Sequence, residues 1–524
     1  MVCFRSTPNT PPPACYTPAR VADNLDSYMK YKLPLNLALA LSASLAFTAT
    51  ASAGIGARFP SEKKILPDPV TGVPLTFLTS TQGHGDSKIY QTHHQWTSDG
   101  KWVIFRSNRG GGNAMAVNEE TGDMVQVSES GFAGMLCVAD HSMHLYFLRQ
   151  LREPAAPGAA PAPGGRGGGM RGPTQVIGVD LAKLFADSAA GKLKASTEYE
   201  RVCGTIPAEY GAGDMALDPT EDYAYVRTGK EYASKHAAAD LKMEGTYGNR
   251  GMGAGPTGLI SVNLHDGSIK DIVTVGFQMG HVQTNPWVPG EIVFCWETGG
   301  KAPQRTWTIR SDGTGLRPLY PEAPYDWITH EAVITQDEVA IAMLYLRTPL
   351  GGNGRRGGAA AVNGAAPANG AAAAAKTGKN GPPQAATAPD NAELQAQTGM
   401  DGHPTGVGIV NLRTREMRIV GQVPLGDPGR SIWHVNGSPD GRWAVADDFQ
   451  YRLWLIDRHS GEMKLLADMG HVTTAADHIH PTFNADSTKI EIQSAMLSQD
   501  KRSLNIVVVP VPQSWLDRKY PKTF

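Results

Sequence analysis

The stretch DHIHPTFNADSTKIEIQS (477–494) decides the fold. It begins with His478 and His480, whose side chains point the same way if the backbone is extended, because side chains alternate along a strand. A small turn follows at 484–487, and the alternating residues 490–492 then indicate a strand. The unit is therefore a histidine placed just ahead of a strand that contains a turn.

The same unit recurs along the chain, in THHQWTSDGKWVIFRS (92–107), GHVQTNPWVPGEIVFCW (280–296), THEAVITQDEVAIAML (329–344) and WHVNGSPDGRWAVADD (433–448). Its turn-and-strand part occurs seven times in all, and it alternates with seven copies of a strand that ends in a hairpin turn and a further strand. Seven four-stranded units of ~40–45 residues are typical of a β-propeller. We therefore predict an all-β, seven-bladed β-propeller over residues 68–512.

The ends of this repeat predict how the ring closes. The last copy, 504–512, lacks its hairpin partner, and the isolated strand VPLTFLTS (73–80) can supply it. Pairing of this N-terminal strand with the last blade removes the exposed sheet edges of a linear array. Residues 54–67 are then a short leader, and residues 513–524 a C-terminal tail.

Three insertions interrupt the spacing. Those near 153–173 and 349–399 are rich in Gly, Ala and Pro and lack apolar periodicity, so we expect disordered loops. The third, 229–255, is polar and glycine-rich and could border a binding site. The chain has no GxSxG element, which argues against a peptidase that combines a propeller with a hydrolase domain.

The N-terminus has the pattern of an export signal. Basic residues at 30 and 32 precede an apolar run over 33–47 and the small residues Ala51-Ser52-Ala53. We expect residues 1–53 to be a signal-peptide region, with translation starting at Met29 and cleavage near Ala53. The mature protein is then periplasmic or secreted.

The charge and the cysteine content exclude some kinds of partner and a disulfide-based fold. The formal net charge of −2 gives no reason to expect nucleic acid or a membrane surface as a partner. Beyond the signal region only Cys137, Cys203 and Cys295 remain, which is not a disulfide framework. Cys137 and Cys295 fall in apolar runs and are expected to be buried. The oligomeric state is left open.

Histidines gather at one phase of the repeat. In a propeller the first strand of each blade lines the central channel, so residues at the starts of these strands meet at one mouth. Seven of the 15 histidines fall there: His93, His94, His281, His330, His434, His478 and His480. A single histidine near a strand start is more often a hydrogen-bonded surface or core residue, but a coincidence in five blades predicts a shared site. Convergent neutral imidazoles are typical ligands of a divalent transition metal.

At these residues the sequence resembles the oligogalacturonate lyase family, seven-bladed propellers in the pectate-lyase class. The matching stretches are Gly280-His281 with PWVPGEIVFCWE, RTWTIRSDGTGLRPL (305–319), Thr329-His330-Glu331 and His478-Ile479-His480-Pro481-Thr482-Phe483. The resemblance covers about 68–512 and is strongest from about residue 280 onward.

The resemblance implies a set of metal ligands. By it, His330, His478 and His480 would hold a divalent ion, with Mn2+ as the expected one. The family's fourth ligand is a glutamine three residues before the His-x-His pair, where this chain has Ala475. His434 from the neighbouring blade, or a water molecule, would fill that place.

The resemblance also implies the catalytic residues. His281 would be the general base, and Arg250 and Arg305 are the two candidates for the arginine that the family uses at its active site. Removal of the C5 proton of a uronide is helped by a cation on the adjacent carboxylate and by an imidazole that accepts the proton. No organic cofactor is needed.

The leading prediction is therefore a metal-dependent lyase that cleaves acidic, oligogalacturonate-like oligosaccharides by β-elimination. One alternative is a non-catalytic periplasmic propeller that binds a partner protein or sugar, like the propeller of TolB proteins. Another is a metal-dependent hydrolase or other sugar-modifying enzyme on the same scaffold. Fold alone does not separate them, because propellers host many functions.

Overall fold

The computed structural model describes residues 54–520 except for 110–111, 152–171, 247–250, 299–301, 324–325, 345–404, 423–431, 449, 470–478 and 501–502. All of these described residues belong to one compact unit, Ser52–Phe524. The signal region, most of the two Gly/Ala/Pro-rich insertions, Arg250, Ala475 and His478 lie outside the described residues. Within the described ranges, the helices are all too short or too polar to cross a membrane.

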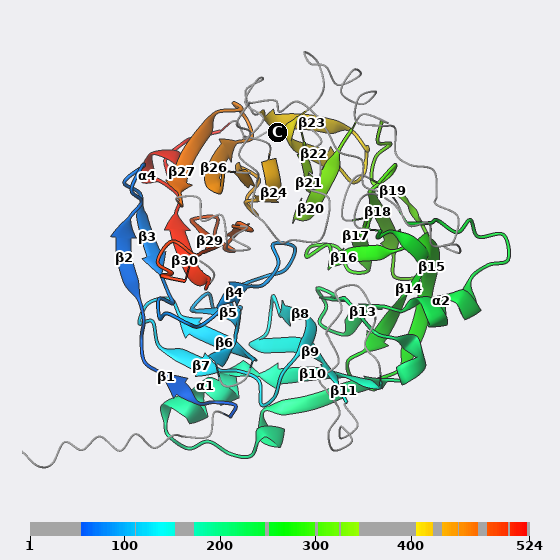
Figure 1. Cartoon of the computed structure of the whole chain (residues 1–524), viewed down its shortest axis with the longest axis horizontal. Coiled ribbons are helices and arrows are strands. Elements are labelled where there is room, and N and C mark those ends of the chain that lie inside the picture. Colours follow the sequence, from blue (N-terminus) through cyan, green and yellow to red (C-terminus); the bar gives the residue numbers. More distant parts are fainter. Residues whose placement is uncertain are drawn as a thin grey trace, which may run out of the picture. The chain divides into compact units, whose positions relative to one another are not determined.

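Seven antiparallel sheets form the unit, and they confirm the predicted seven-bladed propeller (Figure 1). Blade 1 contains β4 (Ser87–Lys88), β5 (Trp102–Ser107), β6 (Asn113–Asn118), β7 (Met124–Gln126) and β1 (Arg58–Phe59). Blade 2 contains β8 (Ala133–Val138), β9 (His144–Gln150), β10 (Thr174–Asp180) and β11 (Glu200–Ile206). Blade 3 contains β12 (Met215–Leu217), β13 (Tyr223–Arg227), β14 (Ala254–Asn263) and β15 (Ile269–Phe277).

The second half of the chain continues the same order. Blade 4 contains β16 (Met279–Thr284), β17 (Glu291–Trp296), β18 (Thr306–Arg310) and β19 (Arg317–Pro318). Blade 5 contains β20 (Ile328–Thr335), β21 (Glu338–Met343), β22 (Gly406–Asn411) and β23 (Met417–Gly421). Blade 6 contains β24 (Ile432–Gly437), β25 (Trp443–Asp448), β26 (Arg452–Asp457) and β27 (Met463–Asp468).

Blade 7 is built from both ends of the described chain. It contains β28 (Thr482–Phe483), β29 (Lys489–Ser494), β30 (Asn505–Pro510), β3 (Pro74–Phe77) and β2 (Lys64–Pro67). Thr76 pairs with Val508 and Phe77 with Val507, so Figure 1 shows the blue strands β2 and β3 beside the red strands of the last blade. The segment 54–67 thus supplies outer strands to blades 1 and 7.

The helices are short. They are α1 (Leu181–Ala189), α2 (Lys230–His236) and α4 (Gln513–Leu516), with 3-10 turns at Ser196–Glu198 and Ala208–Tyr210. The helix α1 lies between two strands of blade 2, and α2 belongs to the third insertion. In the tail, Trp515 of α4 is buried against Trp443 of blade 6, with ring centroids 5.3 Å apart.

The core lies between the blades, because the middle strands are covered on both faces. In β21, Val339, Ile341 and Met343 pack into one buried cluster, while Ala340 and Ala342 pack into the next. Side chains alternate across a strand, so a strand that sits between two neighbouring blades is apolar at almost every position. This explains the continuous apolar runs of the sequence.

A bulge interrupts the innermost strand of several blades at the same level. In blade 5, Thr329 and His330 lie opposite the single residue Ala342, because Ile328 pairs with Met343 and Glu331 with Ile341. The same two-against-one arrangement occurs at 281–282 in blade 4 and at 433–434 in blade 6. A β-bulge bends the strand and re-aims a side chain, so these positions can direct side chains towards a shared centre.

Candidate metal and catalytic centre

Four imidazoles from four blades gather around one tyrosine. The ring centroid of Tyr90 lies 4.9 Å from that of His281 and 5.2 Å from that of His480. It lies 6.4 Å from His330 and 6.3 Å from His434. The His434 ring is in turn 4.2 Å from His330 and 4.0 Å from His480. The structure thus brings together four of the six predicted site histidines that it describes.

Three of the four histidines lie in bulges, and they occupy two different positions there. His330 and His434 are the second residues of theirs. His281 is the first, and it has a left-handed backbone with φ of 49°. His480 also has φ of 50°, just before β28. Such conformations are uncommon outside glycine and cluster at functional sites. The sequence predicted that all these histidines occupy the same position in their blades. In the structure the four divide into two pairs, His330 with His434 and His281 with His480.

His330 and His434 are oriented as metal ligands. The Nδ1–H of His330 is donated to the carbonyl oxygen of Trp433 (2.6 Å). The Nδ1–H of His434 is donated to the buried carboxylate of Asp447 (2.8 Å). Both bonds place the lone pair on Nε2, the arrangement that second-shell partners impose on metal-binding histidines.

The charge state of His330 also suits a ligand. Burial lowers its pKa well below the ordinary value, and the neighbouring His434, His281 and Arg305 lower it further. His330 is therefore a neutral imidazole at neutral pH, which is the form that binds metals.

His480 is held in a different tautomer. The backbone N–H of Lys88 donates to the Gln493 side-chain oxygen (3.1 Å), so the amide nitrogen of Gln493 faces Nδ1 of His480 (3.0 Å) and donates to it. His480 then carries its own proton on Nε2. Binding of a cation at that nitrogen requires loss of this proton and rotation of the Gln493 amide.

His281 lies in a separate network of charged groups. Its Nδ1 is 2.8 Å from the Glu331 carboxylate, and its Nε2 is 3.4 Å from Glu297 and 3.5 Å from the Tyr90 hydroxyl. The side chain is 19% exposed, whereas that of Glu331 is fully buried. Burial lowers the pKa of His281, but its neighbours, with the Glu331 carboxylate as the charged partner, raise it well above the ordinary value. Glu331 thus fixes the ring and stabilises its protonated form.

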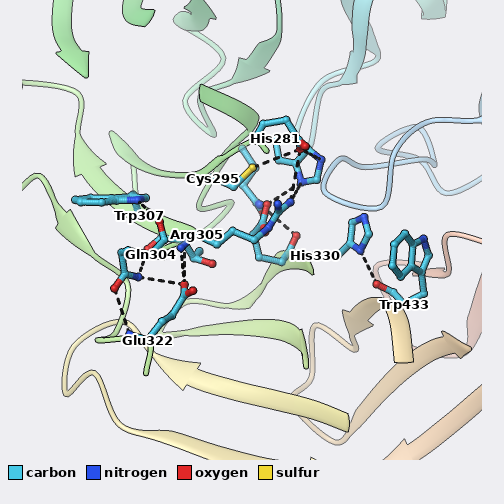
Figure 2. Close-up of polar contacts among 12 residues, drawn as sticks. His281, Cys295, Gln304, Arg305, Trp307, Glu322, His330 and Trp433 are labelled. Carbon is cyan, nitrogen blue, oxygen red and sulfur yellow. Dashed lines mark hydrogen bonds and ion pairs between the residues drawn. The ribbon is translucent and has the colours of Figure 1, made fainter. Parts of the chain in front are cut away.

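Arg305, which lies in the connection between β17 and β18, completes this network. Its Nε donates to Glu331 (3.1 Å), and its Nη2 lies 3.3 Å from Nδ1 of His281 and 3.7 Å from Glu297. Figure 2 shows Arg305 and Cys295 beside His281, and His330 with its ring hydrogen-bonded to Trp433. The Arg305 side chain is only 4% exposed, so it supports His281 and Glu331 more than it faces solvent.

Among the described residues, His281, Cys295 and Glu331 bring three potential ligand atoms within 4.8 Å of one another. Two facts argue against a metal there. The guanidinium of Arg305 already supplies the positive charge at this place. Burial also raises the pKa of the Cys295 thiol to about 11, so it is not a thiolate at neutral pH. The imidazole pair His330 and His434 is the better metal site.

The two histidines predicted from blade 1 lie elsewhere. His93 is buried with its Nε2 3.1 Å from the carbonyl oxygen of Met215, and His94 pairs with Asp140 (2.9 Å). Both follow β4 in the chain instead of starting it, so they face blades 2 and 3. The prediction that they join the shared site is wrong. His478 and Arg250 lie outside the described residues.

Four residues with contacts in the centre were missed as functional residues in the sequence. Glu331 was quoted only as part of a motif, and Asp447 only as the end of a strand. Glu297 was likewise quoted only as the end of a matching stretch. Tyr90 had no signal at all, because its proximity to His281 depends on the packing of separate blades.

Comparison with known protein families finds no family model that matches the chain, and no curated protein matches it in sequence. Two solved structures share its fold. An oligogalacturonate lyase in complex with manganese superposes with a TM-score of 0.59 at 16% identity, over 88% of this chain and 100% of that chain. An oligogalacturonate lyase from Vibrio parahaemolyticus gives a TM-score of 0.56, with the same identity and coverage. The resemblance stated from the sequence is thus confirmed for the fold: this chain has the seven-bladed propeller fold of the oligogalacturonate lyases, at low sequence identity.

Proposed function

We propose that the protein is a metal-assisted lyase that cleaves uronic-acid-containing oligosaccharides by β-elimination. One observation carries this proposal. The rings of His330 and His434 lie side by side, each with its lone pair on Nε2, and they lie near His281, which is held by the Glu331 carboxylate. The first pair suits a cation, and the second arrangement suits proton transfer.

His330 and His434 would hold the ion, together with His480 after its change of tautomer and with His478. A divalent cation bound there would neutralise the substrate carboxylate and stabilise the charge that develops when C5 loses its proton. Manganese is the first ion to test, since the similar lyase structure is a manganese complex. An all-imidazole set also suits later first-row metals such as zinc.

His281 would accept the C5 proton. The carboxylate of Glu331 holds Nδ1–H, which leaves Nε2 as the nitrogen that reacts. The raised pKa makes His281 a stronger base towards a weak carbon acid, at the cost of a smaller neutral fraction at neutral pH. Arg305 would keep both groups in place.

The remaining parts of the prediction belong to the same proposal. The partner would be a short acidic oligosaccharide, with neither nucleic acid nor membrane involved. The place of action would be the periplasm or the exterior. Arg250 stays a candidate for a substrate contact.

The test is metal content followed by turnover. Elemental analysis of the purified protein, before and after chelation, should find about one divalent ion per chain. A panel of uronide oligomers should then give an unsaturated product, seen by ultraviolet absorbance. His281→Ala should keep the metal and lose turnover, while His265→Ala, at an exposed turn next to Asp222, should change neither. Absence of both metal and product would favour the binding-module alternative.

A further inference from the structure

Blade 1 has an enlarged version of the bulge seen in the other blades. Lys88 pairs with Phe105, and Trp96 next pairs with Val103. Seven residues, 89–95, therefore lie opposite the single residue Ile104, where blades 4, 5 and 6 have two residues opposite one. The extra length carries Tyr90 away from its own sheet and into the group of imidazoles from blades 4 to 7.

Tyr90 has a specific place in that group. Its ring is partly exposed and lies between His281 and His480, at centroid distances of 4.9 and 5.2 Å. Its hydroxyl is 3.5 Å from Nε2 of His281, the nitrogen that Glu331 leaves for reaction. A phenol at this point can exchange a proton with His281 and would face a sugar bound beside that ring.

We propose that Tyr90 donates the proton to the leaving oxygen, on the same face of the sugar on which His281 removes the C5 proton. This inference rests on the proposed lyase function and adds the acid, the stereochemistry and the substrate class.

Tyr90 and His281 together supply and accept every proton that the β-elimination needs. The C5–H bond breaks, its proton goes to Nε2 of His281, and its electrons form the C4–C5 double bond. The C4–O4 bond breaks with its electrons on oxygen, which takes the hydroxyl proton of Tyr90. The imidazolium of His281 then returns a proton to the Tyr90 oxygen across their contact. Both side chains regain their starting forms without any further reactant.

The geometry selects the substrate. Because the two groups are neighbours, they serve one face of the ring, so the C5 hydrogen and the C4 oxygen must lie on that face. This holds for 4-linked glucuronate and mannuronate. In galacturonate the C4 oxygen lies on the opposite face from the C5 hydrogen. The structure thus points to oligomers with the gluco or manno configuration at C4.

The experiment compares the wild-type protein with Tyr90→Phe and with the matched control Tyr210→Phe, whose ring stacks on Tyr232 of α2 and not on the histidines. Oligoglucuronate, oligomannuronate and oligogalacturonate are each tested for unsaturated product. Tyr90→Phe should lower turnover at least about 100-fold, the usual contribution of a general acid. Tyr210→Phe should match the wild type.

Two further readouts separate a catalytic role from a structural one. Tyr90→Phe should still exchange the C5 hydrogen in heavy water, because His281 remains. It should also recover turnover on a substrate whose C4 leaving group is fluoride, which needs no proton. Bound metal and the melting temperature should stay at wild-type values.

The outcomes distinguish the two proposals. A wild-type protein that acts on galacturonate alone, or a Tyr90→Phe variant with normal turnover on glycosidic substrates, would overturn this inference and leave the lyase function standing. A wild-type protein that gives neither product nor C5 exchange on any of the three oligomers would overturn the lyase function itself.

Discussion

Replacing Asp447 with asparagine tests the metal site while leaving every imidazole in place. The buried Asp447 side chain lies opposite the bulge of β24. It accepts hydrogen bonds from the backbone N–H of His434 (2.6 Å), from Nδ1–H of His434 (2.8 Å) and from the backbone N–H of His480 (3.3 Å). One carboxylate thus orients two of the proposed ligands.

The expected loss of metal affinity follows from those bonds. A hydrogen bond to a charged group is worth about 1 to 1.5 kcal/mol more than a neutral one, so the change to an amide at the Nδ1 bond alone predicts about a tenfold loss. Outer-shell partners of metal-bound histidines typically contribute about 10- to 100-fold in affinity. Because Asp447 also holds His480, we expect the upper part of that range.

The assay is calorimetric titration of the metal-free protein with Mn2+ and with Zn2+. Asp448→Asn is the matched control, because the next residue on the same strand is also buried but binds Arg452 (2.7 Å) and Trp454 (2.8 Å). Asp448→Asn should lower the melting temperature and leave metal affinity unchanged. Unchanged affinity in Asp447→Asn, or an equal loss in both variants, would refute the reasoning.

Three other predictions test neighbouring parts of the site. His330→Ala should abolish stoichiometric metal, whereas His93→Ala should leave it unchanged because that ring lies outside the cluster; elemental analysis decides between these outcomes. Glu331→Gln should lower kcat on the best uronide oligomer at least about tenfold with metal content preserved, because the imidazolium that His281 forms loses its carboxylate partner. Burial raises the pKa of Glu322 to about 7 from 4.5, so the folded state keeps a proton that the unfolded state has released between these values, and stability falls as pH rises through that window. Glu322→Gln should remove this contribution, so thermal melts from pH 4.5 to 7.5 should decline less steeply in the variant than in the wild type.

The propeller could be predicted because its signals are local. Alternation within each strand and glycine-containing turns between strands depend on residues a few positions apart, and they repeat seven times. The double-sided burial of strands such as β21 even leaves a continuous apolar run in the sequence.

The site was predicted less completely, because counting residues assumes a regular register. A bulge shifts the side-chain alternation by one residue, which is why His281 and His330 face different neighbours. The seven-residue excursion in blade 1 moved His93 away from the centre and brought Tyr90 into it. Contacts such as that of His330 with the Trp433 carbonyl join residues 103 positions apart, and no local pattern reports them.

Blade 7 combines strands from both ends of the described chain, so the proposed ion would have a structural role as well as a catalytic one. The ring is closed where β3 meets β30, two strands that come from opposite ends of the described chain. His480 sits on this blade, whereas His330 and His434 sit on blades 5 and 6. An ion bound by all three would tie the inner end of blade 7 to blades 5 and 6, and so would hold in place the sheet onto which the N-terminal strands β2 and β3 pair. At a free metal concentration 100 times the Kd, occupancy would stabilise the closed ring by about 2.7 kcal/mol. Loss of metal would then remove this stabilisation from three consecutive blades.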